Sequence, residues 1–438
     1  MIKKKKGCAI MKIQAVLIDG FKNLSKVKIN FDKITALVAL NNFGKSNVLS
    51  GIDFGLDFIK ANYEDKINMM SNINLIPINK NTMGTNYRFE METLTEINKK
   101  EYRIVYGYQF SWRYNEKVEP KIVEEYLKVK LEEKGQKYTK LINRTNYTSL
   151  YKSSETGRCS SKIKVEDAEL VINKLRAYDY LYYIDIIKKL NSMKFYMENN
   201  LDAKSFYAPD PIIRKDLKDL ILDADNLPRV IYKLKSTDLK KFQLLKYVYM
   251  QLFPNIQDII VKQFKLNEGT NNELPKDAPF IISNSIYLLY VQDKNLNNII
   301  DFAMMSDGAK RVFMILAKII LANSGDVSLI AIEEPENSIH PSLFQSYITI
   351  ISQLLDNCKV IITSHSPYII SYLNPAWIHV GVNRQPGVAE FFSFKKSGQN
   401  QLQQNANDLN MSIGDYLFSM LAEDDSNVTD YLECNDDE

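Results

Sequence analysis

The chain has 438 residues, which is enough for a large buried core and for roughly two or three structural units. Charged residues make up 25% of it and hydrophobic residues 45%, the proportions of an ordinary soluble globular protein. No apolar stretch reaches the roughly 18 residues of a membrane-spanning helix and no signal peptide is visible, so we expect a cytoplasmic protein without membrane contact.

The net charge of +3 is unevenly distributed along the chain. The last sixteen residues, 423–438, carry eight acids and no lysine or arginine, and we expect this tail to be disordered. The remaining residues hold 56 bases against 45 acids, which is compatible with DNA contact and equally with a solvated, lysine-rich surface. Four scattered cysteines and three histidines lack metal-ligand spacing, so we expect reduced thiols and no zinc site.

The first motif with a chemical function follows a predicted buried strand. Residues 34–40 form a nearly continuous apolar run, which is typical of a central strand. A helix-like segment extends from 48 to about 59. The residues between the two are Asn41, Asn42, Phe43, Gly44, Lys45, Ser46 and Asn47.

This connection predicts a phosphate-binding loop. Backbone N–H groups at the start of the helix would face the phosphates, Lys45 would reach the β and γ groups, and Ser46 can ligate Mg²⁺. The full pattern has a glycine five residues before Gly44, where this chain has Ala39. Ala39 matters only if its position requires a positive φ, at which a Cβ atom is unfavourable.

The middle of the chain changes character twice. Alternating apolar and polar residues predict antiparallel strands at 88–95, 101–112, 123–131 and 138–143. Aromatic residues on these strands are expected to pack in a core rather than to stack on bases. A polar loop is predicted at 147–162, and helical spacing covers 165–201, including an aromatic helix face, and 217–252. The aromatic residues concerned are Tyr106, Tyr108 and Phe110 on the strands and Tyr178, Tyr180, Tyr182 and Tyr183 on the helix.

A second anion-binding turn is predicted between a strand-like segment, 281–291, and an apolar helix, 312–322. Ser306 and Gly308 form a Ser-x-Gly turn there. At such a turn the hydroxyl group, the backbone N–H groups and the helix dipole all favour an anion. A plain helix cap provided by Ser306 or Asp307 is the alternative.

Two adjacent carboxylates end another predicted buried strand. The apolar run 327–332 leads directly to Glu333 and Glu334, at the strand end where open α/β sheets bind ligands. Glu333 stands where an acid would hold a metal, and Glu334 can polarise a water for attack on the γ-phosphate. The alternative is an ordinary pair of acids on the surface, but such a pair poorly explains why two acids directly follow a buried strand. His365 follows the strand-like run 359–363 and could contact the γ-phosphate, although a lone histidine is more often a core residue.

The predicted elements end with strands at 378–382 and 388–394, and a Gln- and Asn-rich segment then leads to a short helix at 413–421. The order of phosphate loop, Ser-x-Gly helix start, acidic strand end and histidine after a strand resembles ABC-type ATPases of the SMC and RecF kind. More specifically it resembles the ATPase module of the OLD (overcoming lysogenization defect) family, which also occurs in bacterial anti-phage systems of Septu and PARIS type. The resemblance covers residues 11 to about 394.

The resemblance implies an α/β ATPase head with a mixed central sheet, an antiparallel β subdomain and an inserted helical lobe. It divides the chain into 11–145 with the phosphate loop and the β subdomain, 146–278 as the lobe, 279–396 as the second part of the head, and 397–438 as an extension. Full OLD nucleases continue into a Toprim domain, for which too few residues follow 394. We therefore expect a separate effector protein, a nuclease or a toxin.

The resemblance also assigns roles to the predicted site residues. Lys45 and Ser46 would bind phosphate and Mg²⁺, Glu333 would hold the metal as the Walker B acid, Glu334 would be the catalytic base and His365 the switch histidine. Ser306 and Gly308 would reach ATP held by a second subunit, which implies a homodimer or higher homo-oligomer with ATP sandwiched between heads. Asn337 and Ser338 would join the two sites, and Gln109 is a candidate for the glutamine loop.

Two other functions stay open at this stage. A DNA-repair ATPase of RecF type would bind DNA and be stimulated by it, whereas a nucleotide-gated scaffold would bind ATP and hardly hydrolyse it. A neighbouring nuclease or toxin gene would instead favour anti-phage defence. ATP hydrolysis with and without DNA distinguishes the first two functions from each other.

Overall fold

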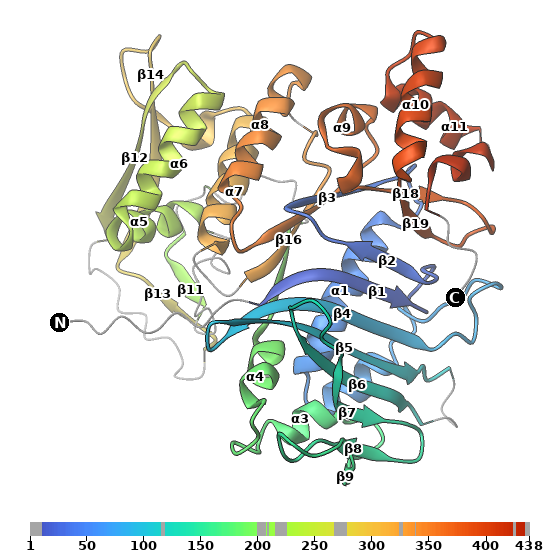
Figure 1. Cartoon of the computed structure of the whole chain (residues 1–438). Coiled ribbons are helices and arrows are strands. Elements are labelled where there is room, and N and C mark those ends of the chain that lie inside the picture. The colour runs from blue at the N-terminus through green and yellow to red at the C-terminus, as the bar shows by residue number, and fades with distance from the viewer. Residues whose placement is uncertain are drawn as a thin grey trace. The chain divides into compact units, whose positions relative to one another are not determined.

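The computed structural model of the chain describes residues 11–114, 119–198, 207, 210–214, 226–266, 278–323, 327–337, 339–423 and 426–433. The chain forms two compact units (Figure 1). The first unit comprises Met1–Glu198, Asp326–Glu334 and Asn357–Glu438, and the second comprises Asn199–Gly325 and Pro335–Asp356. The chain therefore passes from one unit to the other four times, and three of these passages lie next to β10 or β16, whose bounds are given below.

The larger sheet of the first unit has eight antiparallel strands in the order β2-β1-β4-β5-β6-β7-β8-β9. Buried and half-buried residues alternate along β4, the pattern of a strand with one face on a core. The strands predicted at 88–95, 101–112, 123–131 and 138–143 are confirmed as β4 to β7. The bounds are β1 (Lys12–Asp19), β2 (Val27–Asn30), β4 (Tyr87–Ile97), β5 (Lys100–Ser111), β6 (Lys121–Leu131), β7 (Thr139–Arg144), β8 (Ser149–Tyr151) and β9 (Ser161–Lys162).

The second sheet of this unit has six strands in the order β10-β16-β17-β3-β18-β19. The first five run parallel, and β19 joins them antiparallel, so the sheet is mixed as predicted. Continuous apolar runs form the central strands because both faces of a parallel sheet are covered. The bounds are β3 (Ile34–Val38), β10 (Lys194–Glu198), β16 (Val327–Glu333), β17 (Lys359–Ser364), β18 (Ile378–Val382) and β19 (Glu390–Ser393).

Helix α1 (Lys45–Lys60) fills the core that both sheets share. Its Phe54 and Phe58 contact aromatic residues of the eight-stranded sheet, with ring centroids 5.0 Å apart for Phe54 and Tyr87 and for Phe58 and Phe110. Tyr106, Tyr108 and Phe110 are almost completely buried, which confirms the prediction that they pack in a core. The shorter helices of this part are α2 (Tyr63–Met70), α3 (Val171–Leu175) and α4 (Ile184–Ser192).

Two sequence-based predictions for this region are wrong. The predicted helix at 165–201 is divided into α3, α4 and strand β10, which pairs in parallel with β16. Tyr178, Tyr180 and Tyr182 therefore lie in turns before α4 rather than on a helix face. The predicted loop at 147–162 contains two short strands, β8 and β9, because it continues the ladder of β7.

The second unit combines helices with small antiparallel sheets. The predicted strand at 281–291 is divided between β13 and β14, and the predicted helix at 217–252 is divided into α5 and α6, with 217–225 outside the described residues. Helix α7 is buried along nearly its whole length. The bounds are β11 (Ile212–Arg214), α5 (Leu227–Thr237), α6 (Leu239–Leu252), β12 (Ile256–Lys265), β13 (Phe280–Ile282), β14 (Ser285–Asp293), β15 (Ile300–Asp301), η2 (Phe302–Met304), α7 (Asp307–Ala322) and α8 (Pro341–Leu354).

The C-terminal part folds against the six-stranded sheet, contrary to the expected disorder of the tail. The side chains of Val428, Tyr431 and Leu432 are buried, and Lys395 N–H donates a hydrogen bond of 2.9 Å to the Tyr431 carbonyl. Residues 424–425 and 434–438 lie outside the described residues. The elements here are α9 (Pro367–Tyr372), η3 (Pro375–Trp377), α10 (Lys396–Asp408), α11 (Ile413–Ala422) and η4 (Ser426–Tyr431).

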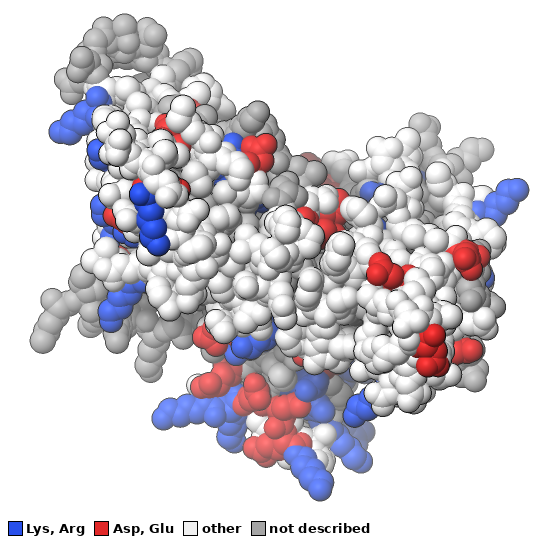
Figure 2. Space-filling model, turned by 90° about the horizontal axis from the view of Figure 1, so that it is seen from above, with Lys and Arg blue, Asp and Glu red and all other residues white. Residues whose placement is uncertain are grey.

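The described helices include none with the length and apolar character to span a bilayer. On the face shown in Figure 2, most of the residues that are not grey are uncharged, and blue lysine and arginine side chains lie among red acidic ones along its lower edge.

Candidate active site

Lys45 is the first residue of α1 and lies inside the loop that connects β3 to this helix. Its Nζ atom donates hydrogen bonds to the carbonyl oxygens of Ala39 at 2.8 Å and Leu40 at 2.9 Å. The loop is thus wrapped around the lysine, whose side chain is buried. A cation at a helix N-terminus opposes the helix dipole, unless an anion is bound beside it. The ammonium group and the N–H groups of the first turn are the kinds of donor that a phosphate site requires.

The loop backbone requires residues that tolerate a positive φ. Gly44 has a φ of 128° and Asn42 a φ of 59°. A Cβ atom added at Gly44 would lie 2.9 Å from the Ala389 Cβ and 3.0 Å from the Asn23 Oδ1. Glycine is therefore needed at 44 both for its backbone conformation and for the space around it.

Ala39 causes no backbone strain, because its φ is not positive. Its methyl group is buried against the neighbouring strand β18, where Gly381 leaves room for it. A Cβ at Gly381 would lie 2.8 Å from the Ala39 Cβ and 2.5 Å from a ring carbon of Phe43. The missing glycine of the phosphate-loop pattern is thus compensated by a glycine on the adjacent strand.

Asn23 holds the phosphate loop from outside, a role that the sequence did not reveal. Its amide Nδ2 donates to the Phe43 carbonyl at 3.0 Å, and its Oδ1 accepts from Asn47 Nδ2 at 2.8 Å. Lys22 Nζ donates to Asn47 Oδ1 at 3.3 Å. The predicted phosphate ligand Asn47 therefore has a structural role, and Phe43 packs edge-on against Phe391 at 5.4 Å between ring centroids.

A pocket of about 640 Å³ opens beside the first turn of α1, where Asn47 and Asn23 form part of its wall. Isoleucines supply apolar surface and Lys22 supplies positive charge close to the loop. Such a mixture suits a flat, partly polar group attached to a phosphate. The other residues of the wall are Ile73, Asn74, Ile76, Ile78, Asn79 and Gly387.

Glu334 and His365 are hydrogen-bonded to each other, with 2.9 Å between His365 Nδ1 and Glu334 Oε1. Glu334 follows the last residue of β16 and has a φ of 44°, an uncommon conformation for a residue with a side chain. Its N–H donates to the Thr363 carbonyl at 2.9 Å, which fixes the turn to β17. Both side chains are about one third exposed, so they are held in place and remain open to solvent.

The sheet register brings the predicted site residues to one edge. Glu333 is paired with Thr363, and Ser364 is paired with Val38, at the carboxyl ends of β16, β17 and β3. Since these strands are parallel neighbours, the acids, His365 and the phosphate loop all emerge at the same end of the sheet. This edge is where open α/β sheets bind ligands.

Ser46 and Glu333 offer the oxygen atoms that Mg²⁺ prefers. Ser46 is exposed on the first turn of α1, and Glu333 ends a strand two positions away from β3 in the sheet. Two strand spacings amount to about 10 Å, so the two side chains could hold one ion between them, directly or through its waters.

The remaining predicted residues lie elsewhere. Ser306 is the N-cap of α7 in the second unit, and its hydroxyl accepts from Ala309 N at 3.3 Å; Gly308 is in the first turn of that helix. The Asn337 carbonyl accepts from Arg311 Nη1 at 3.0 Å, and Ser338 lies outside the described residues. Asn41 is exposed in the phosphate loop, whereas Gln109 pairs with Arg88 and Glu124 in the eight-stranded sheet. Their roles towards a nucleotide stay predictions.

The family model described as AAA ATPase domain matches residues 11–370 of the sequence. The chain therefore belongs to the family of AAA ATPase domains. Its fold is the mixed α/β head with an antiparallel sheet and an inserted lobe that the sequence predicted. No curated protein matches the sequence.

Among solved structures, similar chains are heads of SMC proteins. An SMC head bound to the C-winged helix domain of ScpA is 13% identical, with 89% of this chain and 99% of that chain covered and a TM-score of 0.47. The SMC head domain from Thermotoga maritima is 11% identical, with 88% and 99% covered and a TM-score of 0.42. An SMC head from Pyrococcus furiosus, with an extended coiled coil and bound to the C-terminal domain of ScpA, is 12% identical, with 91% and 100% covered and a TM-score of 0.45. At these TM-scores the similarity defines neither the site nor the activity.

Proposed function

We propose that the chain binds ATP with Mg²⁺ and hydrolyses it to ADP and phosphate. The observation that carries this proposal is the Glu334–His365 pair at the carboxyl edge of the sheet that also bears the Lys45 loop. A phosphate loop alone would serve a binding protein. A carboxylate held by a histidine at the same edge adds a base for the attacking water.

Each side chain then has a defined task. Lys45 and the N–H groups of the first turn bind the β- and γ-phosphates, and the base and ribose enter the pocket beside Asn47. Ser46 and Glu333 would hold Mg²⁺, which neutralises phosphate charge when bound. Glu334 accepts the proton of the attacking water, and His365 orients the carboxylate and lies close to where the γ-phosphate would lie.

ATP hydrolysis by the purified wild-type chain, Glu334→Gln and Lys45→Ala tests this function. We expect turnover in the wild type only, ATP binding in the wild type and in Glu334→Gln, and neither in Lys45→Ala. If the wild type binds ATP without hydrolysing it, the protein is a nucleotide-gated scaffold rather than an enzyme. Normal turnover in Glu334→Gln would contradict the assignment of the base. Stimulation by double-stranded DNA would favour a repair function.

We further propose that the protein is of ABC type and dimerises head to head around ATP. Ser306 and Gly308 would reach the nucleotide of the partner subunit, and Asn337 would lie in the loop that joins the two sites, as the resemblance to SMC-like ATPases implies. Light scattering of Glu334→Gln should show an ATP-dependent dimer, or a higher oligomer, that Ser306→Ala loses. Ser412→Ala is the matched control, because Ser412 also caps a helix, and its loss should leave the dimer intact. Equal dimerisation of both cap variants would contradict the role of Ser306.

The resemblance to the OLD ATPase module is the basis for a finer proposal. ATP-driven dimerisation would control a separate nuclease or toxin in anti-phage defence. Plaque counts on cells that carry the chain with its adjacent genes provide the test. Lys45→Ala should abolish protection against phage, and equal protection by wild type and variant would contradict the proposal.

A further inference from the structure

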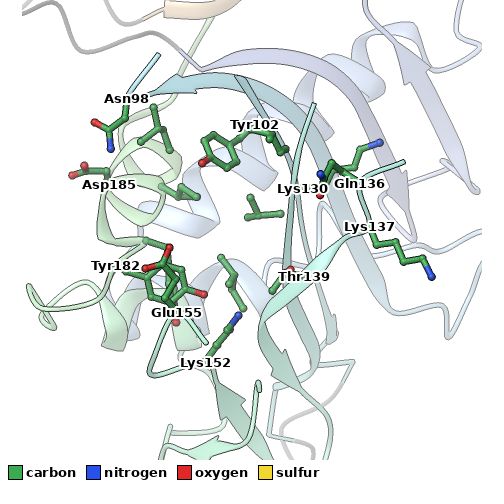
Figure 3. Close-up of a pocket in the computed structure, with 16 residues that line it drawn as sticks. Asn98, Tyr102, Lys130, Gln136, Lys137, Thr139, Lys152, Glu155, Tyr182 and Asp185 are labelled. Carbon is green, nitrogen blue, oxygen red and sulfur yellow. The ribbon is translucent and has the colours of Figure 1, made fainter. Parts of the chain in front are cut away.

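A second pocket of about 500 Å³ lies in the first unit, between strands β5 to β7 and helix α4 (Figure 3). One end of strand β4 lies near the phosphate loop, because Arg88 of β4 pairs with Asp19 of β1, which is close to Asn23. The pocket lies at the other end of β4, beyond Ile97. The 11 residues of β4 span about 35 Å. The two pockets are therefore separate sites of the same unit.

The pocket has the composition of a ligand site. Tyr102 and Lys152 lie on opposite sides of the open space, and Tyr182 and Asp185 border it from the side of α4 (Figure 3). Aliphatic side chains cover the rest of its wall, so a ligand would bury an apolar part against them. These aliphatic residues are Ile97, Val129, Leu131, Leu141 and Ile186.

Lys152 is the most informative residue of this pocket. Its side chain is 8% exposed, and within the described ranges its ammonium group makes no hydrogen bond and no ion pair. Its Nζ atom lies 5.8 Å from the centroid of the Tyr182 ring, and its charge also acts on the Cys159 thiol. Lysine is seldom buried to this extent without a partner, and the Lys152 ammonium faces the open space of the pocket. An anion in the pocket would provide the missing partner.

A second buried polar group borders the same pocket. Tyr183 is 2% exposed, and its hydroxyl group has no hydrogen-bond partner in the described part of the chain. A buried hydroxyl without a partner costs stability, and native structures contain few of them. Lys130 and Lys137 add positive charge at the edge of the pocket, where Glu155 and Asp185 add negative charge.

We propose that this pocket binds a small organic anion with a flat apolar part and a phosphate or carboxylate group. The anionic group pairs with the Lys152 ammonium, and the flat part lies between Tyr102 and Tyr182 over the aliphatic wall. The site is independent of the nucleotide site and does not require that the chain hydrolyses ATP.

Ligand-observed saturation-transfer NMR on the full chain tests the proposal. The probes are phenyl phosphate, benzoate and uncharged benzamide, measured in the Lys45→Ala background so that the phosphate loop does not contribute. We expect at least one of the two anions to bind and benzamide to bind about tenfold more weakly, since a charge-assisted hydrogen bond is lost. Comparison of phenyl phosphate with benzoate identifies the preferred anionic group.

Lys152→Met removes the charge and keeps the apolar stem, and it should weaken binding of the anion about tenfold. Lys164→Met is the matched control, because Lys164 is exposed and does not border the pocket, and it should bind as before. If Lys152→Met does not fold, Tyr182→Ala takes its place, since Tyr182 is 44% exposed. Unchanged binding in the pocket variant, equal binding of benzamide, or no binding of either anion would overturn the proposal.

Discussion

The Glu334 carboxylate accepts its hydrogen bond from an imidazole that comes from the neighbouring strand, at 2.9 Å between Oε1 and His365 Nδ1. Because β16 and β17 pair in parallel, and Glu334 N–H bonds to the Thr363 carbonyl, both side chains are set by the same sheet register. The sheet register and these two hydrogen bonds thus hold the pair in place. A preorganised base requires little rearrangement during catalysis.

We expect His365→Asn to lower kcat for ATP by about 10- to 100-fold and to leave ATP affinity unchanged, because it loses only the group that orients Glu334. The second variant, Glu334→Gln, should lower kcat by at least about 100-fold. Steady-state hydrolysis of both variants and the double variant forms a cycle. If the two residues act as a unit, the double variant is about as slow as Glu334→Gln alone. If the two reductions in kcat multiply in the double variant, the proposed coupling between His365 and Glu334 is wrong.

Lys45→Met should weaken ATP binding by more than about 100-fold, since a charge-assisted contact to phosphate is lost in a buried loop. The loop should remain folded, because methionine keeps the apolar stem of the side chain. Isothermal titration with ATP and Mg²⁺ measures the change. Lys60→Met at the other end of α1 is the matched control and should bind ATP normally. Weak binding by both variants would indicate general damage to the helix.

Gly381→Ala should destabilise the phosphate loop, because the new Cβ would meet the Phe43 ring and the Ala39 methyl group. Overpacking of this kind costs about 1–3 kcal/mol of unfolding free energy, and ATP affinity should fall with it. The double variant Ala39→Gly/Gly381→Ala removes one of the two clashes and should recover part of the loss. Ala39→Gly alone should lower stability by about 1 kcal/mol without improving ATP binding. Tighter binding in that single variant would show that Ala39 impairs the loop after all.

Burial of His379 on β18 lowers the pKa of its imidazole from 6.5 to about 4. The unfolded chain binds more protons than the folded one between these values, so the stability contribution is present above pH 6.5 and is lost as the pH falls towards 4. Wild type should lose about 2 kcal/mol more than His379→Leu between pH 7 and pH 5 in urea unfolding. Equal losses of unfolding free energy in wild type and His379→Leu would contradict a buried, neutral His379.

The pH dependence of the wild type alone would not isolate His379, because Asp53 affects stability with the opposite sign. The quantity to measure is therefore the difference between wild type and His379→Leu. Burial and the charge of Asp57 raise the pKa of the Asp53 carboxyl group from 3.8 to about 6. The folded chain then binds more protons in that interval, and the stability contribution is lost as the pH rises through 6. Since Asp53 is present in both proteins, it cancels in the difference.

The common location of the candidate site residues could be predicted from the sequence because each part of the site follows a continuous apolar run. Such runs define parallel strands, and their carboxyl ends share one edge by geometry, so Lys45, Glu334 and His365 could be assigned to one place. Asn23 and Gly381 could not be found in this way. Both act through contacts between segments distant in the chain, and neither belongs to a periodic pattern.

The errors of secondary structure have a physical cause as well. Strand β10 is short, and its neighbour β16 decides its conformation, whereas its sequence alone is equally suited to a helix. Helix α10 has a Gln- and Asn-rich sequence, but Gly398, Leu402 and Ala406 recur every four residues and form its buried face. Residues 426–433 of the acidic tail fold because Val428, Tyr431 and Leu432 bury apolar surface in spite of the charge around them.

The four passages of the chain between the units have a structural consequence. Strand β10 ends at Glu198, where the second unit begins, and Glu334 is the last residue before the chain enters that unit again. The residue proposed to activate water is thus a covalent neighbour of the second unit, without an intervening linker. The backbone conformation of Glu334, with its positive φ, is therefore set at the point where the chain leaves the first unit.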